Sequence, residues 1–133
     1  MEPPVLRKPK LHFDAAPHAS HVTFDDGKDL RRNIPWSLYV EARWEYTNLD
    51  AITVEIGDWL VVLKGNNLEP LFRAIEEHTL VRVCAHADWA NSNQDRAMDT
   101  YLTEIQFTKQ PPGMAAKRRG QIELDLGPLG GLG

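Results

Sequence analysis

Residues Ile52–Leu63 read ITVEIGDWLVVL, and this stretch decides the fold because it predicts a β-hairpin of defined register. Gly57 and Asp58 suit a two-residue turn with glycine at the first central position. That turn produces three apolar cross-strand pairs on one face: Ile56 with Trp59, Val54 with Val61, and Ile52 with Leu63. The intervening residues of the second strand are also apolar, so we expect residues 59–64 to form a central strand covered on both sides.

A helix is predicted after the hairpin, over about residues 68–78. Its apolar side chains recur at the i, i+3, i+4, i+7 spacing of a buried stripe: Leu68, Leu71, Phe72 and Ile75. The preceding stretch Gly65–Leu71, GNNLEPL, could either hold a phosphate at the helix start or cap the helix. Pro70 removes one amide donor and Glu69 adds a negative charge, so we assign the stretch to capping, with Asn67 as the N-cap residue.

Alternating patterns predict further strands on both sides of this unit. Residues 37–46 (SLYVEARWEY) give the clearest pattern, with one apolar face made of Leu38, Val40, Ala42, Trp44 and Tyr46. Residues 21–32 predict a hairpin that turns at Asp26–Gly27, and residues 80–87 and 100–107 predict two strands after the helix. The elements together predict an α+β fold, with a mostly antiparallel sheet of about six to seven strands, one helix on one face, and the order β-β-α-β-β around it.

The 133 residues divide into three parts by composition. Residues 1–19 are rich in proline and charge, and we expect them to form a flexible N-terminal arm. Residues 20–108 are predicted to form a single domain. Residues 109–133 are predicted to be a linker and C-terminal tail, in which the IELDL of residues 122–126 alternates like a short strand.

Charge is distributed unevenly around an overall net charge of −4. Residues 20–108 carry eight basic and fifteen acidic side chains, a net charge of −7, which repels a phosphate backbone. Nucleic acid is therefore not expected as a partner, and no membrane association is expected because no apolar run could span a bilayer. Cys84 is the only cysteine and no secretory signal is recognisable, so we expect a cytoplasmic protein without disulfides.

Cys84, His86 and Asp88 are the candidates for catalysis or metal binding, since period-two spacing places them on one strand face. A thiol, an imidazole and a carboxylate can form a nucleophile–base–orienter set or part of a metal site. Same-face neighbours on a strand are about 7 Å apart, however, and no C-x-x-C or H-E-x-x-H motif is present. We therefore assign no catalytic, metal or cofactor residue, and keep an enzyme or metal site at this triplet as an alternative.

Two other groups of residues bear on binding. Asp25, Asp26 and Asp29 loosely resemble a calcium loop but lack its distal glutamate, so turn chemistry explains them. Trp36 and Trp89 lie in or beside predicted loops, and tryptophan is enriched at interaction hot spots. We take these two tryptophans as candidate contact residues.

The C-terminal tail gives the leading functional hypothesis. A short alternating strand on a tether can pair with an exposed sheet edge of its own subunit or of a neighbour. Ile122, Leu124 and Leu126 would then fill alternate pockets. The sequence thus favours a small non-enzymatic protein-interaction or assembly module, with protein partners and self-association through sheet edges and the tail.

The order hairpin, helix and two further strands, followed by Gly130–Gly131 in the tail, resembles a ubiquitin-type β-grasp domain. The resemblance implies a modifier whose C-terminal glycines are activated and conjugated by partner enzymes. Leu132 and Gly133 follow the glycine pair, so trimming is implied unless Gly133 itself reacts. The extra strands predicted before residue 50 depart from the compact β-grasp pattern, and the resemblance is one of topology alone.

Overall fold

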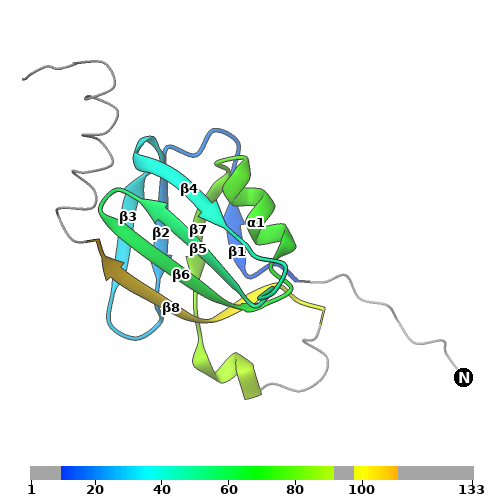
Figure 1. Cartoon of the computed structure of the whole chain (residues 1–133). Coiled ribbons are helices and arrows are strands. Elements are labelled where there is room, and N and C mark those ends of the chain that lie inside the picture. Colours follow the sequence, from blue (N-terminus) through cyan, green and yellow to red (C-terminus); the bar gives the residue numbers. More distant parts are fainter. Residues whose placement is uncertain (1–9, 92–97, 111–133) are drawn as a thin grey trace, which may run out of the picture.

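The computed structural model describes residues 10–91 and 98–110, which form two facing β-sheets and one α-helix (Figure 1). Sheet I has the strand order β1 (Phe13–Ala15), β7 (Leu80–Cys84), β2 (His21–Asp25) and β3 (Arg31–Pro35). Sheet II has the order β4 (Tyr39–Arg43), β5 (Ala51–Ile56), β6 (Trp59–Asn66) and β8 (Tyr101–Lys109). The other elements are helix α1 (Glu69–Glu76) and two 3-10 turns, η1 (Trp36–Leu38) and η2 (Ala87–Asn91).

The central hairpin, β5–β6, has the predicted register. Its inward-facing pairs are Ile56 with Trp59, Val54 with Val61, and Ile52 with Leu63. Gly57 has a φ of 61°, while Asp58 keeps a negative φ, as a type II′ turn requires. β6 is central because β8 pairs with its other edge, but the outward-facing Leu60 and Val62 are only half-buried. The strand is therefore central as predicted, and its outer face is covered in part.

The fold is α+β and mostly antiparallel, as predicted, but its strands form two sheets instead of one. β7 was expected in the same sheet as the hairpin, and it pairs instead parallel with β2 and antiparallel with β1. Alternation in the sequence fixes which side chains turn inward, but it does not say which strand supplies the hydrogen bonds. The β-grasp resemblance gains no support, because β5–β6 and β7 lie in different sheets.

Strand β1 moves the boundary of the N-terminal arm. Residues Phe13–Ala15 were placed in the flexible arm over residues 1–19, yet they pair with β7, with Phe13 opposite Val83. Three residues are too few for an alternating pattern to be recognised in the sequence. The ordered domain therefore begins before residue 20.

The predicted strand over residues 37–46 is shorter and less buried than expected. Its first residues form η1, and β4 runs only from Tyr39 to Arg43. A β-bulge between Tyr39 and Glu41 shifts the register against β5. Tyr39 and Ala42 consequently pack against the core, while Val40 is 47% exposed.

Helix α1 begins after Leu68 and is not capped by Asn67. Leu68 is the N-cap residue, and no side chain bonds the first helix amides. Asn67 has a left-handed backbone, with φ at 50°, and its side-chain amide donates to the carbonyl of Met98 at 2.9 Å. The hydroxyl of Thr100 donates in turn to the carbonyl of Asn67 at 2.6 Å. Asn67, which was predicted to cap the helix, instead forms hydrogen bonds with the segment that leads into β8.

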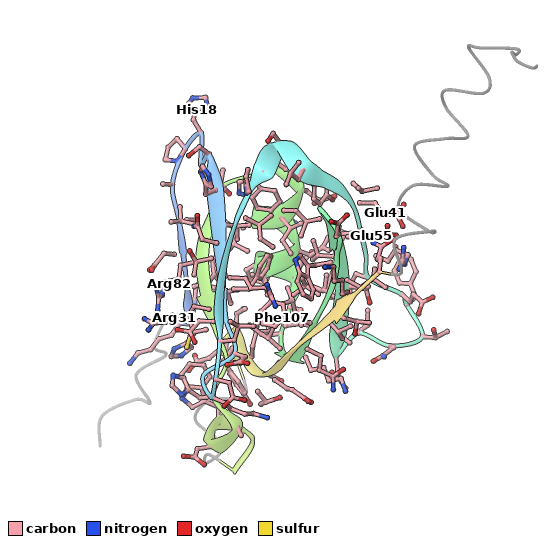
Figure 2. The ribbon with its side chains drawn as sticks, turned by 90° about the vertical axis from the view of Figure 1, so that its left-hand side faces the viewer. His18, Arg31, Glu41, Glu55, Arg82 and Phe107 are labelled. Atoms are coloured by element: carbon pink, nitrogen blue, oxygen red, sulfur yellow. The ribbon has the colours of Figure 1, made fainter. Side chains whose placement is uncertain are left out.

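The core lies between the sheets, and different elements close its two sides. On the β1 side lies α1 (Figure 1), whose buried residues are Leu71, Ala74 and Ile75. On the β3 side, the guanidinium of Arg32 lies 3.5 Å from the centroid of the Trp59 ring and 5.2 Å from that of Phe107. Figure 2 shows Phe107 between the two sheets. A cation over an aromatic face is attracted to the ring quadrupole, so Arg32 links β3 to sheet II.

We predict that Gly65→Ala destabilises the domain more than Gly57→Ala does. A Cβ at Gly65 would lie 2.0 Å from the backbone oxygen of Tyr101 in β8, so the two strands would have to separate. We expect a loss of about 3 kcal/mol, the upper range for overpacking. At Gly57 an added Cβ meets only Leu38 at 3.5 Å, which leaves a positive-φ penalty of about 1–2 kcal/mol. Urea denaturation measures both, and an equal or smaller loss for Gly65→Ala would contradict the assigned packing.

Candidate functional site

The structure brings together two members of the predicted Cys84–His86–Asp88 triplet. Cys84 ends β7, and its Sγ lies 3.6 Å from Nε2 of His86. Asp88 belongs to η2, after the strand has ended, and no hydrogen bond joins it to Cys84 or His86. The predicted common strand face is therefore interrupted before its third member.

The surroundings of Cys84 oppose formation of a thiolate. Burial and the nearby carboxylate of Asp25 raise the pKa of the Cys84 thiol, and the smaller influence of Arg82 does not reverse this. Arg82 is itself paired with Asp25, with 2.8 Å between guanidinium nitrogen and carboxylate oxygen. Reactive cysteines lie in electropositive surroundings that lower the thiol pKa, so this pair lacks an activated nucleophile. Over residues 10–91 and 98–110, no three His, Cys, Asp or Glu side chains are arranged to hold a metal ion.

The aspartates of the β2–β3 loop bond the loop itself. Oδ1 of Asp26 accepts the backbone N–H groups of Lys28, Asp29 and Leu30 at 2.8, 2.9 and 3.0 Å. The bonds from Leu30 and Lys28 contribute most to lowering the pKa of Asp26. A carboxylate that accepts three amides is a turn-forming group, in agreement with the turn chemistry inferred from the sequence.

The two candidate tryptophans lie in different environments. Trp36 is only 5% exposed, and its indole N–H donates to the carbonyl of Leu80 at 3.0 Å. We therefore remove Trp36 from the candidate contact residues, because its ring is part of the core. Trp89 is half-buried, and its ring centroid lies 4.7 Å from that of His12 and 4.6 Å from that of His86. These two imidazoles leave only part of the indole available for a partner.

The other candidate contact residues lie outside the described part of the chain: Ile122, Leu124, Leu126, Gly130, Gly131 and Gly133. The sheet edges that a strand over residues 122–126 would meet are described, and they can be compared. The edge strand β1 has only three residues, and β3 ends in a proline, which cannot donate to a ladder. β8, the other edge of sheet II, is bridged by Ala85 at Leu102, and the exposed residues of its second half are polar. β4 is the edge with large exposed apolar side chains, Leu38 and Val40.

Strand β4 and its flanks form the candidate functional site. Among the described strands β4 pairs with β5 alone, so its other edge has no strand partner there. Four large apolar side chains in or near β4 are exposed by 49%, 47%, 97% and 49%, respectively: Leu38, Val40, Tyr46 and Leu49. An open edge with apolar side chains is a template for pairing with another strand. We call this strand together with the four side chains the β4 surface.

A groove of about 440 Å³ adjoins the β4 surface on the side of the helix. It is lined by Trp44, Tyr46 and Leu49 from the β4–β5 connection and by Glu69, Phe72, Arg73 and Glu76 from α1. The ring centroids of Trp44 and Phe72 are 5.4 Å apart. Arg73 pairs with Glu69 within the helix, with 3.3 Å between the charged groups. The groove offers aromatic contacts beside an open backbone edge.

The sequence pattern missed the exposure of the β4 surface, although it contains one signal. In an alternating strand, Leu38, Tyr39 and Val40 are three consecutive apolar residues. Such a run cannot turn wholly inward in a regular strand, so it marks either cover on both faces or a bulge. The clean alternation of the following residues led to a prediction that all five apolar positions share one face.

No protein-family model, curated protein or solved structure matches this chain. Among the described residues, no helix has the length and apolar character needed to cross a bilayer.

We predict that Cys84 is slow to alkylate and that Asp25 is a cause. Because its pKa is raised, the alkylation rate should still increase with pH above pH 9, where an ordinary thiol is largely ionised. Asp25→Asn removes a nearby negative charge and should lower the pKa of Cys84, which raises the rate of iodoacetamide labelling at pH 8. Asp29→Asn is the control, since Asp29 is not among the groups that shift Cys84. Equal labelling rates in wild type and Asp25→Asn would contradict this assignment.

We predict that Asp26 makes the domain sensitive to acid. Its pKa is lower in the folded state than in the unfolded state, so its contribution is complete above the unfolded value near pH 4 and is lost as pH falls towards the lowered pKa. Asp26→Asn should lose this part of the pH dependence, and Asp26→Ala should cost about 1 kcal/mol at pH 7, like the loss of a helix cap. Urea denaturation at pH 7 and pH 3 measures both effects. If Asp26→Asn kept the full acid sensitivity of wild type, the assignment would be wrong.

Proposed function

We propose that this chain is a non-enzymatic assembly module that self-associates through the β4 surface, with β4 of one copy paired antiparallel to β4 of a second copy. The observation that supports the proposal most directly is the open edge of β4 with the half-exposed side chains of Leu38 and Val40. A partner strand would pair with the backbone groups of this edge and cover its exposed apolar side chains.

Charge complementarity supports a second copy as the partner. In an antiparallel pair centred on Ala42, within the regular part of β4 after the bulge, Glu41 of each copy would lie opposite Arg43 of the other. A pair centred one residue earlier would set Glu41 against Glu41, which is unfavourable. The sequence of β4 thus matches itself in one register. An isologous contact of this kind closes as a dimer and does not extend into a fibre.

The surroundings of Cys84 fit the same proposal. Its thiol is held protonated, and the chain has no second cysteine with which to form an internal disulfide. A free thiol is usual in a reducing compartment, so we place this module in the cytoplasm. We assign it no cofactor, and its expected partners are protein chains.

Self-association should depend on Val40. Val40→Lys adds a charge to the paired edge and should weaken the dimer at least tenfold, which corresponds to about 1.4 kcal/mol. Sedimentation equilibrium of the full chain over a series of concentrations measures the dissociation constant. Leu30→Lys is the matched control, because Leu30 is 38% exposed but lies in the β2–β3 loop. A wild-type chain that stays monomeric at every concentration, or equal association of both variants, would overturn the proposal.

A further inference from the structure

The described chain ends in a residue that is fixed across sheet II. The backbone N–H of Gln110 donates to the carbonyl of Asp58 at 2.8 Å, which continues the pairing of β8 beyond its last residue. The side-chain amide of Gln110 lies 3.4 Å from Oε2 of Glu55 in β5, and Oε1 of Glu55 accepts a hydrogen bond from Arg43 in β4 at 2.8 Å. Gln110 and Glu55 are only 6% and 3% exposed. Gln110, the last described residue, is therefore held at a defined point, with its side chain directed towards Glu55 and β4.

The position of Gln110 is close to the start of β4. Asp58, which holds Gln110, follows Gly57, and the N–H of Gly57 donates to the carbonyl of Leu38 at 2.8 Å. Leu38 directly precedes β4. A groove of about 430 Å³ adjoins the same residues, with Pro35, Leu38, Asp58 and Trp59 in its lining. A chain continuing from Gln110 can therefore reach the β4 edge along the end of the sheet.

We propose that residues 122–126 of the same chain pair with the open edge of β4 as a fifth strand of sheet II and so compete with the second copy. This inference rests on the proposed function for the ability of the β4 edge to accept a strand. Residues 111–121 would form the link, and eleven residues span at most about 36 Å when extended. A fifth strand lies four strand spacings from β8, about 19 Å, so the link is long enough.

The side chains of residues 122–126 have the character that the inner and outer faces of sheet II would require of a fifth strand. Ile122, Leu124 and Leu126 alternate with two acidic residues. On the inner side they would continue the core past Ala42 and meet the groove that contains Trp44 and Phe72. On the outer side the acidic residues would lie near Arg43, whose guanidinium already bonds carboxylates on that face. Figure 2 shows Glu41 and Glu55 on this outer side of sheet II.

The link favours the segment of the same chain over that of another copy. A short flexible link gives a tethered segment an effective concentration in the millimolar range. A segment from a second copy would have to be present at a similar concentration to compete. The tail thus acts as an intramolecular cover of the edge, and its release exposes the β4 surface to a partner.

Cross-linking in the full chain tests this arrangement. In a Cys84→Ser background, Glu41→Cys is combined with Glu123→Cys and treated with a bismaleimide whose spacer of about 10 Å covers opposite and diagonal cross-strand neighbours. We expect a cross-linked product of monomeric mass, formed at a rate that does not change on dilution. The control combines Lys28→Cys, in the exposed β2–β3 loop, with Glu123→Cys. Equal yields for the two pairs, or a product of dimeric mass only, would overturn the proposal.

A second measurement separates this inference from the proposed function. Leu124→Asp should release the tail, make the Glu41→Cys and Lys28→Cys pairs cross-link equally, and strengthen self-association about tenfold. Leu129→Asp, which lies outside residues 122–126, is the matched control and should change neither the cross-linking nor the association. Weaker association of Leu124→Asp would mean that the tail joins two copies and would overturn the intramolecular cover. A monomeric mass for wild type and Leu124→Asp, together with the intramolecular cross-link, would retain the cover and reject self-association through β4.

Discussion

The close approach of β6 and β8 at Gly65 is the constraint on which the rest of the structure depends. Because Gly65 has no side chain, the backbone of Tyr101 and Leu102 can cross it at a distance that any other residue would block. The side-chain amide of Asn66 then donates to the carbonyl of Asp99 at 2.9 Å, next to the bonds made by Asn67. Thr100, which directly precedes β8, also exchanges backbone hydrogen bonds with Lys10 and His12. One contact thus fixes the start of the helix, the last strand and the N-terminal segment together.

The contacts of β8 with the rest of the domain also explain why β4 has an edge without a strand partner. The first half of β8 is tied to sheet I through the bridges of Ala85 with Leu102 and Leu11 with Thr100. Its second half contains Phe107, which lies under the guanidinium of Arg32 from β3. β4 is linked to sheet I at its first residue, where the centroid of the Tyr39 ring lies 5.5 Å from that of Trp36 and the indole N–H of Trp36 donates to the carbonyl of Leu80 in β7. Two isolated bridges and the contact of Arg32 with Phe107 thus link β8 to the other half of the sandwich, whereas the outer edge of β4 has no partner among the described strands.

Local features of this fold were predictable from the sequence, and long-range ones were not. Gly57–Asp58 sets the hairpin register, because a turn and its alternation are encoded within twelve residues. The pairing of β7 with β2 joins residues almost sixty positions apart, and alternation carries no information about such a partner. Asn67 has the side chain of a capping residue, but its environment includes the returning Met98 segment, which sequence spacing does not show. The β4 surface was hidden for a related reason: a bulge between Tyr39 and Glu41 turns Leu38 and Val40 outward, while Ala42 after the bulge still packs against the core as predicted.

The small free energy of the contacts that β4 can make determines how binding at this edge can be regulated. The regular part of β4 offers about three cross-strand pairs, each worth about 0.2–1 kcal/mol. Burying the exposed parts of Leu38 and Val40 adds at most a few kcal/mol more, since full burial of such a side chain gives about 1.5–3 kcal/mol. An untethered strand that gains only this free energy binds with a dissociation constant near the millimolar range, where 1 mM corresponds to about 4.1 kcal/mol. A tethered segment at a comparable effective concentration is therefore closely balanced against a free partner. Because β4 is short and bulged, neither the tail segment nor a second copy binds it permanently. Small changes in the tail or in protein concentration are sufficient to exchange the tail for the second copy.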